Sequence, residues 1–156
     1  MRVYRVERAK YLKTTLSGIG ASMAKGYRWN SQNTKLVYTS ESRALATLEV
    51  SVHLDVSEDL PLDRYYIEID IPVDLAILEV DIKDLPDDWN AKPPTLTTQT
   101  IGDDFVIQND AAILKVPSSI VIQEYNYLIN PNHPDAKRIK VVSKTPMIFD
   151  QRLKEK

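Results

Sequence analysis

Residues 26–54 constrain the fold most, because a short apolar run is followed at once by helix-capping chemistry and then by a longer apolar segment. The run Leu36-Val37-Tyr38 is typical of a buried strand. Hydroxyl and carboxylate side chains occupy residues 39–42, where they suit the first turn of a helix. We therefore expect a strand that leads directly into a helix over about residues 41–54.

The expected helix carries an apolar stripe with an acid at its edge. Ala44, Leu45, Leu48 and Val52 recur at the three-four spacing of a core-facing helix surface. Glu49 lies four residues after Leu45, at the margin of this stripe. An isolated buried charge is costly, so this carboxylate is expected either to form an ion pair or to face a cleft.

Arg28 is the candidate partner for Glu49. Its guanidinium could pair with the acid, or it could fix its own turn through forked hydrogen bonds, and the spacing leaves both open. Tyr38 ends the apolar run between these two residues. The sequence therefore predicts that a guanidinium, a phenol and a carboxylate lie within range of one another.

Six blocks of the sequence, in order, resemble one known family. They read G-Y-R-W-N, V-Y-T-S-E-S, L-A-T-L-E-V-S-V-H, I-G-D-D-F, V-P-S-S-I and N-Y-L-I-N-P-N-H-P-D. Together they resemble the RES domain family, named after its Arg, Glu and Ser, over nearly the whole chain. The resemblance implies an α+β fold similar to that of ADP-ribosyltransferase toxins, with twisted antiparallel or mixed sheets and inserted helices. We expect one domain over residues 1–156.

The resemblance also implies a toxin of a type II toxin–antitoxin pair that consumes NAD, with Arg28, Tyr38, Glu49 and Ser118 in the catalytic site. Cleavage of the nicotinamide–ribose bond develops positive charge on the sugar, which a carboxylate such as Glu49 would stabilise. Arg28 suits the pyrophosphate, because a guanidinium can donate two parallel hydrogen bonds. Tyr38 offers a ring for stacking and a hydroxyl for orientation, and Ser118 a hydroxyl for the ribose or the amide.

Further substrate-binding candidates are Arg5, Asn126 and Asn130. Arg5 is the second choice for the pyrophosphate, and the two asparagines offer both donors and acceptors. The family pattern usually has two glycines before the Arg, whereas Tyr27 stands at the second position here. Because a tyrosine tolerates positive φ less well than glycine, the turn before Arg28 is expected to differ from the family's.

Composition excludes several function classes. With 20 basic and 22 acidic residues, the net charge is −2, so no broad basic surface for direct nucleic-acid binding is expected. There is no cysteine for disulfides, and no apolar run approaches the roughly 20 residues that span a bilayer, so we expect no membrane contact and a cytoplasmic protein. His53 and His133 have no metal-site spacing, so neither metal nor cofactor is expected, with NAD as a substrate.

Other elements follow from local patterns. Ile67, Ile69 and Ile71 alternate with polar residues and predict a half-buried strand over residues 64–71. Residues 1–6 are expected to form an edge strand, and residues 120–125 a further strand after Pro117-Ser118-Ser119.

Two questions stay open at this point: the reaction and the assembly. NAD could be degraded by hydrolysis or phosphorolysis; alternatively, ADP-ribose could be transferred to a protein, or the chain could be a noncatalytic nucleotide- or peptide-binding module. The resemblance implies a cognate helix-turn-helix antitoxin whose C-terminal part blocks the NAD cleft. A homodimer is also compatible with the sequence.

Overall fold

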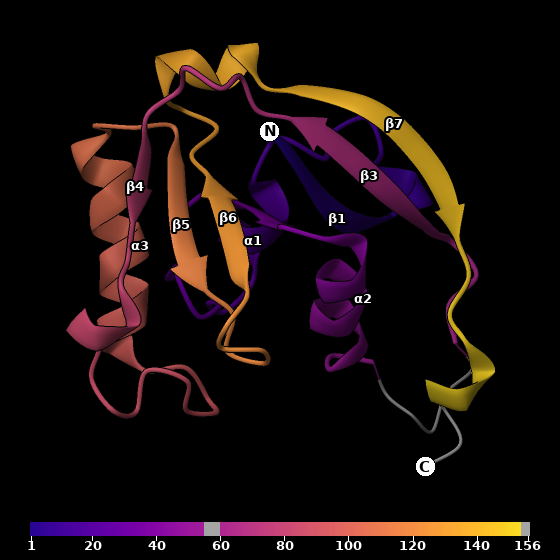
Figure 1. Cartoon of the computed structure of the whole chain (residues 1–156), viewed down its shortest axis with the longest axis horizontal. Helices are drawn as coiled ribbons and strands as arrows, with labels where there is room; N and C mark the ends of the chain where they lie inside the picture. The colour runs from indigo at the N-terminus through magenta and orange to yellow at the C-terminus, as the bar shows by residue number, and fades with distance from the viewer. Residues whose placement is uncertain (55–59, 154–156) are drawn as a thin grey trace.

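The computed structural model describes residues 1–54 and 60–153. Short helices are inserted between strands along the whole chain (Figure 1). The strands are β1 (Arg2–Arg8), β2 (Val37–Ser40), β3 (Arg64–Asp70), β4 (Ile77–Glu79), β5 (Ile113–Pro117), β6 (Tyr125–Ile129) and β7 (Lys140–Met147). The α-helices are α1 (Ile19–Met23), α2 (Arg43–Ser51) and α3 (Leu96–Gln108), and the 3-10 helices are η1 (Ala9–Tyr11), η2 (Ile82–Asp84), η3 (Pro134–Arg138) and η4 (Gln151–Leu153).

The strands form one 7-stranded sheet in the order β4-β5-β6-β2-β1-β3-β7. All neighbouring strands are antiparallel except β4 and β5, which are parallel, so the sheet is mixed. β1 and β2 are paired at one position only, Tyr4 with Ser40. The sheet thus has two well-paired halves joined by a narrow bridge, and α2 stands between them in Figure 1.

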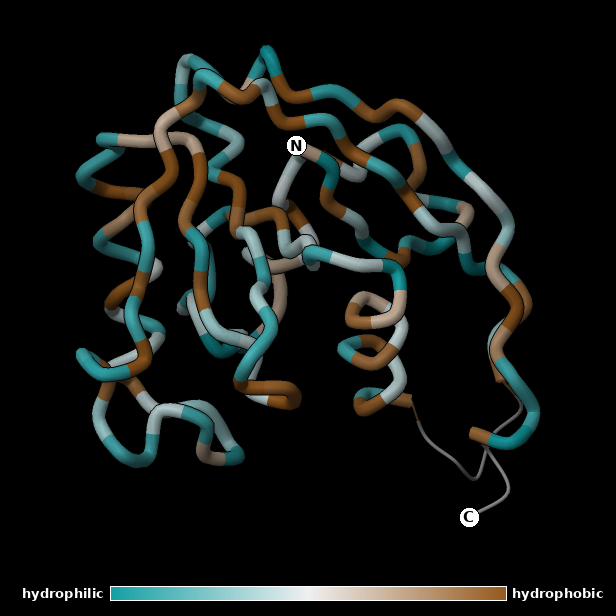
Figure 2. The backbone as a smooth tube through the Cα atoms, in the orientation of Figure 1, coloured by the Kyte–Doolittle hydropathy of each residue, from teal (hydrophilic) through white to brown (hydrophobic). Residues whose placement is uncertain are grey.

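One buried apolar cluster spans both halves of the sheet, and a second lies on the half that contains β5 and β6. Along β5, Ile113 belongs to a buried cluster with Val3, Ile67 and Ile129, whereas Leu114 belongs to a second cluster that contains residues of α3. Successive strand residues point to opposite faces, so the two clusters lie on opposite sides of the sheet. Figure 2 shows the apolar stretches along the strands in brown.

The strand predicted over residues 64–71 is confirmed. β3 covers Arg64–Asp70, and Ile67, Ile69 and Ile71 are buried. The edge-strand prediction for residues 1–6 is wrong, because β1 pairs with β3 along its whole length and with β2 on its other side. The strand predicted over residues 120–125 is also wrong: these residues form a loop, and β6 begins at Tyr125.

The helix predicted after the apolar run is present as α2, but its buried face differs from the predicted stripe. Leu45 is buried, whereas Ala44, Leu48 and Val52 are exposed. The polar contacts of Glu49 described below fix the rotation of the helix about its axis. Three of the four stripe residues therefore face outward.

Candidate functional site

Glu49 projects from α2 toward the ends of β5 and β6. The helix begins after Ser42, whose Oγ accepts a hydrogen bond from the Leu45 amide at 3.0 Å. Glu49 Oε1 accepts hydrogen bonds from Ser118 Oγ at 2.8 Å and from Asn126 Nδ2 at 2.6 Å. Within residues 1–54 and 60–153, Oε2 accepts no hydrogen bond. One carboxylate oxygen is thus fixed by the protein and the other is free to meet a ligand.

Ser118 is fully buried at the end of β5 and shapes the loop that follows. Its Oγ accepts hydrogen bonds from the Ile120 amide at 3.1 Å and the Val121 amide at 3.2 Å, while donating to Glu49. Such local side-chain-to-backbone bonds compete with strand pairing, which explains why the expected strand does not form here. The hydroxyl acts as a fixed donor to Glu49.

The side-chain amide of Asn126 is held through its oxygen as well as through its nitrogen. It lies opposite Ser40 in the pairing of β2 with β6, and its Oδ1 accepts a hydrogen bond from Ser40 Oγ at 2.7 Å. That bond orients the amide so that Nδ2 faces Glu49. Ser40 was not among the predicted site residues, although it belongs to the V-Y-T-S-E-S block. A hydroxyl one strand away from an asparagine gives no signal until the strand register is known.

The turn that carries Arg28 is closed by a hydrogen bond from the Tyr27 amide to the Asn30 carbonyl at 3.0 Å. Gly26 has φ 124°, whereas the non-glycine residues with positive φ in the described ranges are Asn33 and Asn109. Tyr27 therefore adopts an ordinary backbone conformation, and the positive φ that the turn requires occurs at Gly26. The tyrosine in place of the family's second glycine is accommodated without strain.

The guanidinium of Arg28 is anchored along one edge only. Nη1 donates hydrogen bonds to the carbonyl oxygens of Trp89 at 2.8 Å and Ala91 at 3.1 Å. In the part of the chain that the structure describes, Nε and Nη2 donate none, which leaves an edge of the fork free for an anion. Burial lowers the pKa of Arg28, while Glu49 and Tyr38 act in the opposite direction. The three groups thus lie within electrostatic range of one another.

The hydroxyl of Tyr38 is bonded to neighbouring residues of the protein. The hydroxyl donates to Asn30 Oδ1 at 2.7 Å and accepts from the Trp29 amide at 3.2 Å. Burial raises the pKa of this phenol well above its usual range, so it stays protonated. The ring lies 5.4 Å from that of Tyr27, at an interplanar angle of 55°. The hydroxyl thus both donates to and accepts from the protein, and the ring packs against the second apolar cluster.

Asn30 connects this phenol to the preceding loop. It is fully buried, and its Nδ2 lies within hydrogen-bonding distance of the carbonyl oxygens of Ala21 at 3.1 Å, Ser31 at 3.0 Å and Thr34 at 3.3 Å. A buried amide satisfied in this way holds its surroundings firmly. Asn30 was not predicted as a site residue, although it ends the G-Y-R-W-N block.

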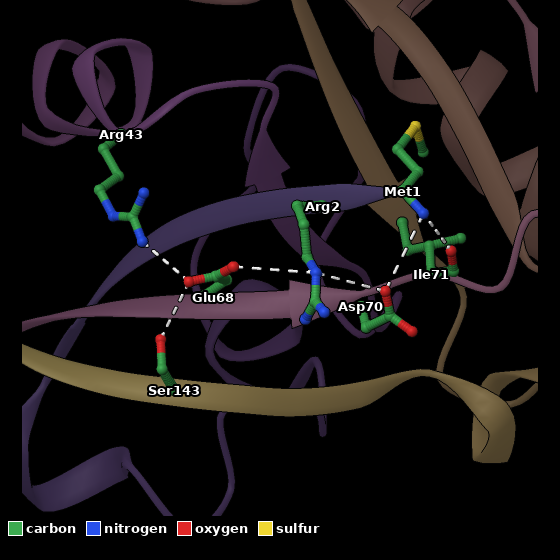
Figure 3. A network of polar contacts seen from close by, with 7 residues as sticks. All are labelled: Met1, Arg2, Arg43, Glu68, Asp70, Ile71 and Ser143. Atoms are coloured by element: carbon green, nitrogen blue, oxygen red, sulfur yellow. Dashed lines mark hydrogen bonds and ion pairs between the residues drawn. The ribbon is translucent and has the colours of Figure 1, made fainter.

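A charged network fixes the first turn of α2 against the sheet (Figure 3). Arg43 Nη2 donates to Glu68 Oε2 on β3 at 2.8 Å, and Ser143 Oγ on β7 donates to the same oxygen at 3.1 Å. Arg2 on β1 lies between the two acids, with Nε 3.8 Å from Glu68 Oε1 and 3.5 Å from Asp70 Oδ1. These contacts tie the helix that carries Glu49 to three strands.

The sequence pattern of the family described as "RES domain" matches residues 2–150. The chain belongs to the RES domain family. The family prediction is thereby confirmed. In this RES domain Ser118 contacts Glu49 directly, whereas the guanidinium of Arg28 contacts the carbonyl groups of Trp89 and Ala91.

Two relatives are similar in sequence to this chain over nearly its whole length. "Prs ADP-ribosylating toxin" of Sphingobium sp. (strain YBL2) is 43% identical over 145 residues, covering 92% of this chain and 89% of the relative. "Toxin Res" of Photorhabdus laumondii subsp. laumondii is 38% identical over 155 residues, covering 98% of this chain and 97% of the relative.

The fold is similar to a chain in the crystal structure of the M. tuberculosis MbcT–MbcA toxin–antitoxin complex. The TM-score is 0.76 at 17% identity, and the match covers 99% of this chain and 86% of that chain. The predicted α+β class, with a twisted mixed sheet and inserted helices, is confirmed by this likeness and by the strand order of the RES domain.

Arg5 lies outside the Glu49 hydrogen-bond network of the RES domain. Its Nη1 donates to the Thr15 carbonyl at 3.1 Å, and its Nη2 lies 2.9 Å from Glu7 Oε2. Burial lowers its pKa, with Glu7 opposing that effect. In the described ranges its buried Nε has no hydrogen-bond partner. One donor therefore holds the segment around Thr15, and another pairs with Glu7 on the same strand.

Asn130 is also separate from Glu49. It follows the end of β6, is fully buried, and donates from Nδ2 to Asn109 Oδ1 at 2.8 Å. Its Oδ1 accepts from the Asn132 amide at 3.0 Å. Of the two asparagines predicted to bind substrate, the structure brings Asn126 to Glu49 and places Asn130 at the opposite end of the strand.

The surface cavity of about 520 Å³ on this RES domain is lined by residues including Leu16, Ile129, His133 and Lys137. Ile129 belongs to the cluster on the face of the sheet away from Asn126, so this cavity is separate from the Glu49 region. Within residues 1–54 and 60–153, no group of three or more His, Asp or Glu side chains could hold a metal. In the same ranges, no helix has the length and apolarity to cross a bilayer.

Proposed function

We propose that this protein is the toxin of a toxin–antitoxin pair and that it consumes NAD by cleaving the bond between nicotinamide and ribose. Membership of the RES domain family supports this proposal, as do relatives named "Toxin Res" and "Prs ADP-ribosylating toxin". The observation that carries it is the arrangement of Glu49: Oε1 is bonded to Ser118 and Asn126, and Oε2 accepts no hydrogen bond within residues 1–54 and 60–153.

The chemistry needs a fixed negative charge beside the sugar. When the bond breaks, its electron pair leaves with the nicotinamide nitrogen, and positive charge develops on the ribose. Two neutral donors on Oε1 hold the Glu49 carboxylate in place without neutralising it. The open oxygen then faces the developing cation, and its effect is stronger in a partly buried site than in water.

Arg28 and Tyr38 would bind the pyrophosphate and the nicotinamide of NAD. Nε and Nη2 of Arg28, which donate no hydrogen bond to the described residues, match two oxygens of a pyrophosphate, and the carbonyl contacts on Nη1 hold that edge in position. The ring of Tyr38, whose hydroxyl is bonded to Asn30, offers a flat surface to the nicotinamide. Together the three residues bind an anion, an aromatic ring and the reacting sugar.

The acceptor of ADP-ribose defines two versions of the reaction. Water or phosphate as acceptor degrades NAD, which is the version we place first. A protein acceptor makes the enzyme an ADP-ribosyltransferase, and the name of the relative that is 43% identical favours this second version. Both versions share bond cleavage and therefore require Glu49.

NAD labelled in the adenosine part distinguishes these versions. Purified protein is incubated with labelled NAD, with and without phosphate, and nicotinamide release is followed. The same reaction is repeated with purified Prs, the acceptor that the name of the 43% identical relative indicates. Free ADP-ribose indicates hydrolysis, ADP-ribose phosphate indicates phosphorolysis, and label on Prs indicates transfer. Folded protein that releases no nicotinamide under any of these conditions contradicts the proposal.

Glu49→Gln is the decisive variant, because glutamine keeps an oxygen to accept from Ser118 and Asn126 but has no charge. We expect kcat to fall on the order of a hundredfold or more, with NAD binding retained. Asp104→Asn is the matched control, since Asp104 is an exposed acid on α3. Equal activity of Glu49→Gln and wild type would remove the catalytic role of the carboxylate.

As a toxin of the cytoplasm, the protein would require a neutralising partner. We propose a cognate helix-turn-helix antitoxin that covers the Glu49 region, with DNA contacts belonging to the antitoxin. Expression of the chain alone should arrest growth and lower cellular NAD, and co-expression of the proposed antitoxin should restore growth. Normal growth with abundant folded protein and normal NAD contradicts the toxin assignment.

A further inference from the structure

One face of α3 supports the turn that carries Arg28. Gln99 Nε2 donates to the Tyr27 carbonyl at 3.0 Å, just before Arg28. Gly102, one helical turn later, lies so close to the Trp29 carbonyl that a Cβ there would be 1.6 Å from the oxygen. Residues three apart on a helix share a face, so α3 contacts the turn on both sides of Arg28.

Asp103 completes this support with both of its oxygens. Oδ1 accepts from the Ser31 amide at 3.0 Å, and Oδ2 accepts from Ser31 Oγ at 2.5 Å. Hydrogen bonds to a charged acceptor are stronger than those between neutral groups. Ser31 follows directly after Asn30, whose carbonyl closes the Arg28 turn by accepting from the Tyr27 amide. The carboxylate therefore fixes the C-terminal end of that turn.

We propose that Asp103 is a positioning residue for Arg28: by clamping Ser31, it sets where the free edge of the guanidinium meets the anionic part of the substrate. Both carboxylate oxygens are bonded to Ser31, so Asp103 acts through the turn and does not contact the substrate. This inference rests on the proposed function, because Arg28 binds the pyrophosphate only if NAD is the substrate. It assigns a role to the I-G-D-D-F block, which the proposed reaction does not otherwise use.

The inference predicts a particular kinetic signature. A residue that merely stabilises the fold lowers the amount of active protein and leaves KM unchanged. A residue that aims an anion ligand changes KM, because pyrophosphate binding contributes to the ground state as well as to the transition state. Positional errors on the ångström scale cost up to about 100-fold in rate or binding.

Asp103→Ala, Asp103→Asn and Asp104→Ala form the test. For Asp103→Ala we expect KM for NAD to rise about tenfold, with kcat changed far less. Asp103→Asn should stay close to wild type, because its amide oxygen can accept from the Ser31 amide and its NH₂ can donate to Ser31 Oγ. Asp104→Ala, at the adjacent exposed position, should match wild type in both constants. An unchanged KM in folded Asp103→Ala overturns the inference.

Ser31→Ala provides a second variant in case Asp103→Ala does not fold. It removes only the hydroxyl bond and keeps the amide bond to Oδ1, so the rise in KM should have the same direction and be smaller. Amide hydrogen exchange at Ser31 should quicken in Asp103→Ala and not in Asp104→Ala. Wild-type protein that neither binds nor cleaves NAD overturns the proposed function and the inference with it. Wild-type activity together with KM values that do not respond to either variant overturns the inference alone.

Discussion

The helices α2 and α3 hold the two charged sides of the proposed site by different physical means. α3 buries Thr98, Gly102 and Phe105 and packs into the cluster that contains Trp29 and Trp89. α2 buries only Leu45 and Ala46 and is tied to its surroundings largely by polar contacts. The turn on the guanidinium side is therefore held by close packing against α3 as well as by hydrogen bonds, whereas the carboxylate side is held mainly by hydrogen bonds.

This difference matters because packing and polar contacts respond differently to substitution. A close-packed backbone contact cannot relax without moving its neighbours, so a single added methyl group is costly. A polar contact can be replaced by water where it is exposed, but it is expensive to break where it is buried. Substitution of the close-packed Gly102 beneath the Arg28 turn should therefore affect the fold, and substitutions around Glu49 should affect mainly the geometry of the carboxylate.

Gly102→Ala tests the packed side and should have the largest effect. The new Cβ would lie 1.6 Å from the Trp29 carbonyl oxygen, so the Arg28 turn must move away from α3. We expect a loss of about 2–4 kcal/mol in the free energy of unfolding and a Tm lower by roughly 5–15 °C, measured by thermal and urea unfolding.

Gly20→Ala is the matched control for that substitution. Gly20 lies in α1, and a Cβ built on it meets nothing within 4 Å. An alanine in such a helix position should be neutral or stabilising by about 0.5–1 kcal/mol. If both variants unfold at the wild-type temperature, close packing does not determine the position of the Arg28 turn.

Ser118→Ala tests the hydrogen-bonded side and should have an intermediate effect. It removes one of the two donors to Glu49 Oε1 and leaves the amides of Ile120 and Val121 without their acceptor. We expect a loss of about 1–3 kcal/mol in stability and about a tenfold fall in kcat for nicotinamide release, with KM little changed.

Ser119→Ala provides the adjacent control, since Ser119 is half-buried and makes no hydrogen bond through its hydroxyl among the described residues. Its kcat should match wild type. A Ser118→Ala enzyme with full kcat would show that Asn126 alone suffices to orient the carboxylate.

The same contrast explains what the sequence could predict. β3 was predicted correctly because one isoleucine at every second position reports a half-buried strand without reference to any other segment. Glu49 was recognisable because an acid beside apolar residues is unusual on its own helix. Local pattern and family blocks therefore led to the site prediction of Arg28, Tyr38, Glu49 and Ser118, which stays a prediction.

What could not be predicted depends on contacts between distant segments. The stripe of Ala44, Leu48 and Val52 looked core-facing, but the rotation of α2 is set by Ser118 and Asn126, far along the chain. Asp103 and Asn30 were visible in family blocks without a role, because most of their partners are backbone groups. No side-chain pattern in a sequence reports which carbonyl or amide a polar residue will meet.

Removal of the exposed ion pair between Arg43 on α2 and Glu68 on β3 should have the smallest effect. Arg43 is 46% exposed at its side chain and lies over the Tyr4 ring at 4.4 Å, so water and salt screen much of its attraction to Glu68. Arg43→Gln should lower the free energy of unfolding by about 1 kcal/mol or less, and the loss should shrink between low salt and about 0.5 M salt. Thr47, which bonds the Tyr66 hydroxyl at 2.7 Å one helical turn later, should keep α2 in place, so kcat should stay near wild type. If Arg43→Gln instead lowers kcat as much as Ser118→Ala does, the exposed pair, rather than the buried donors, controls where Glu49 points.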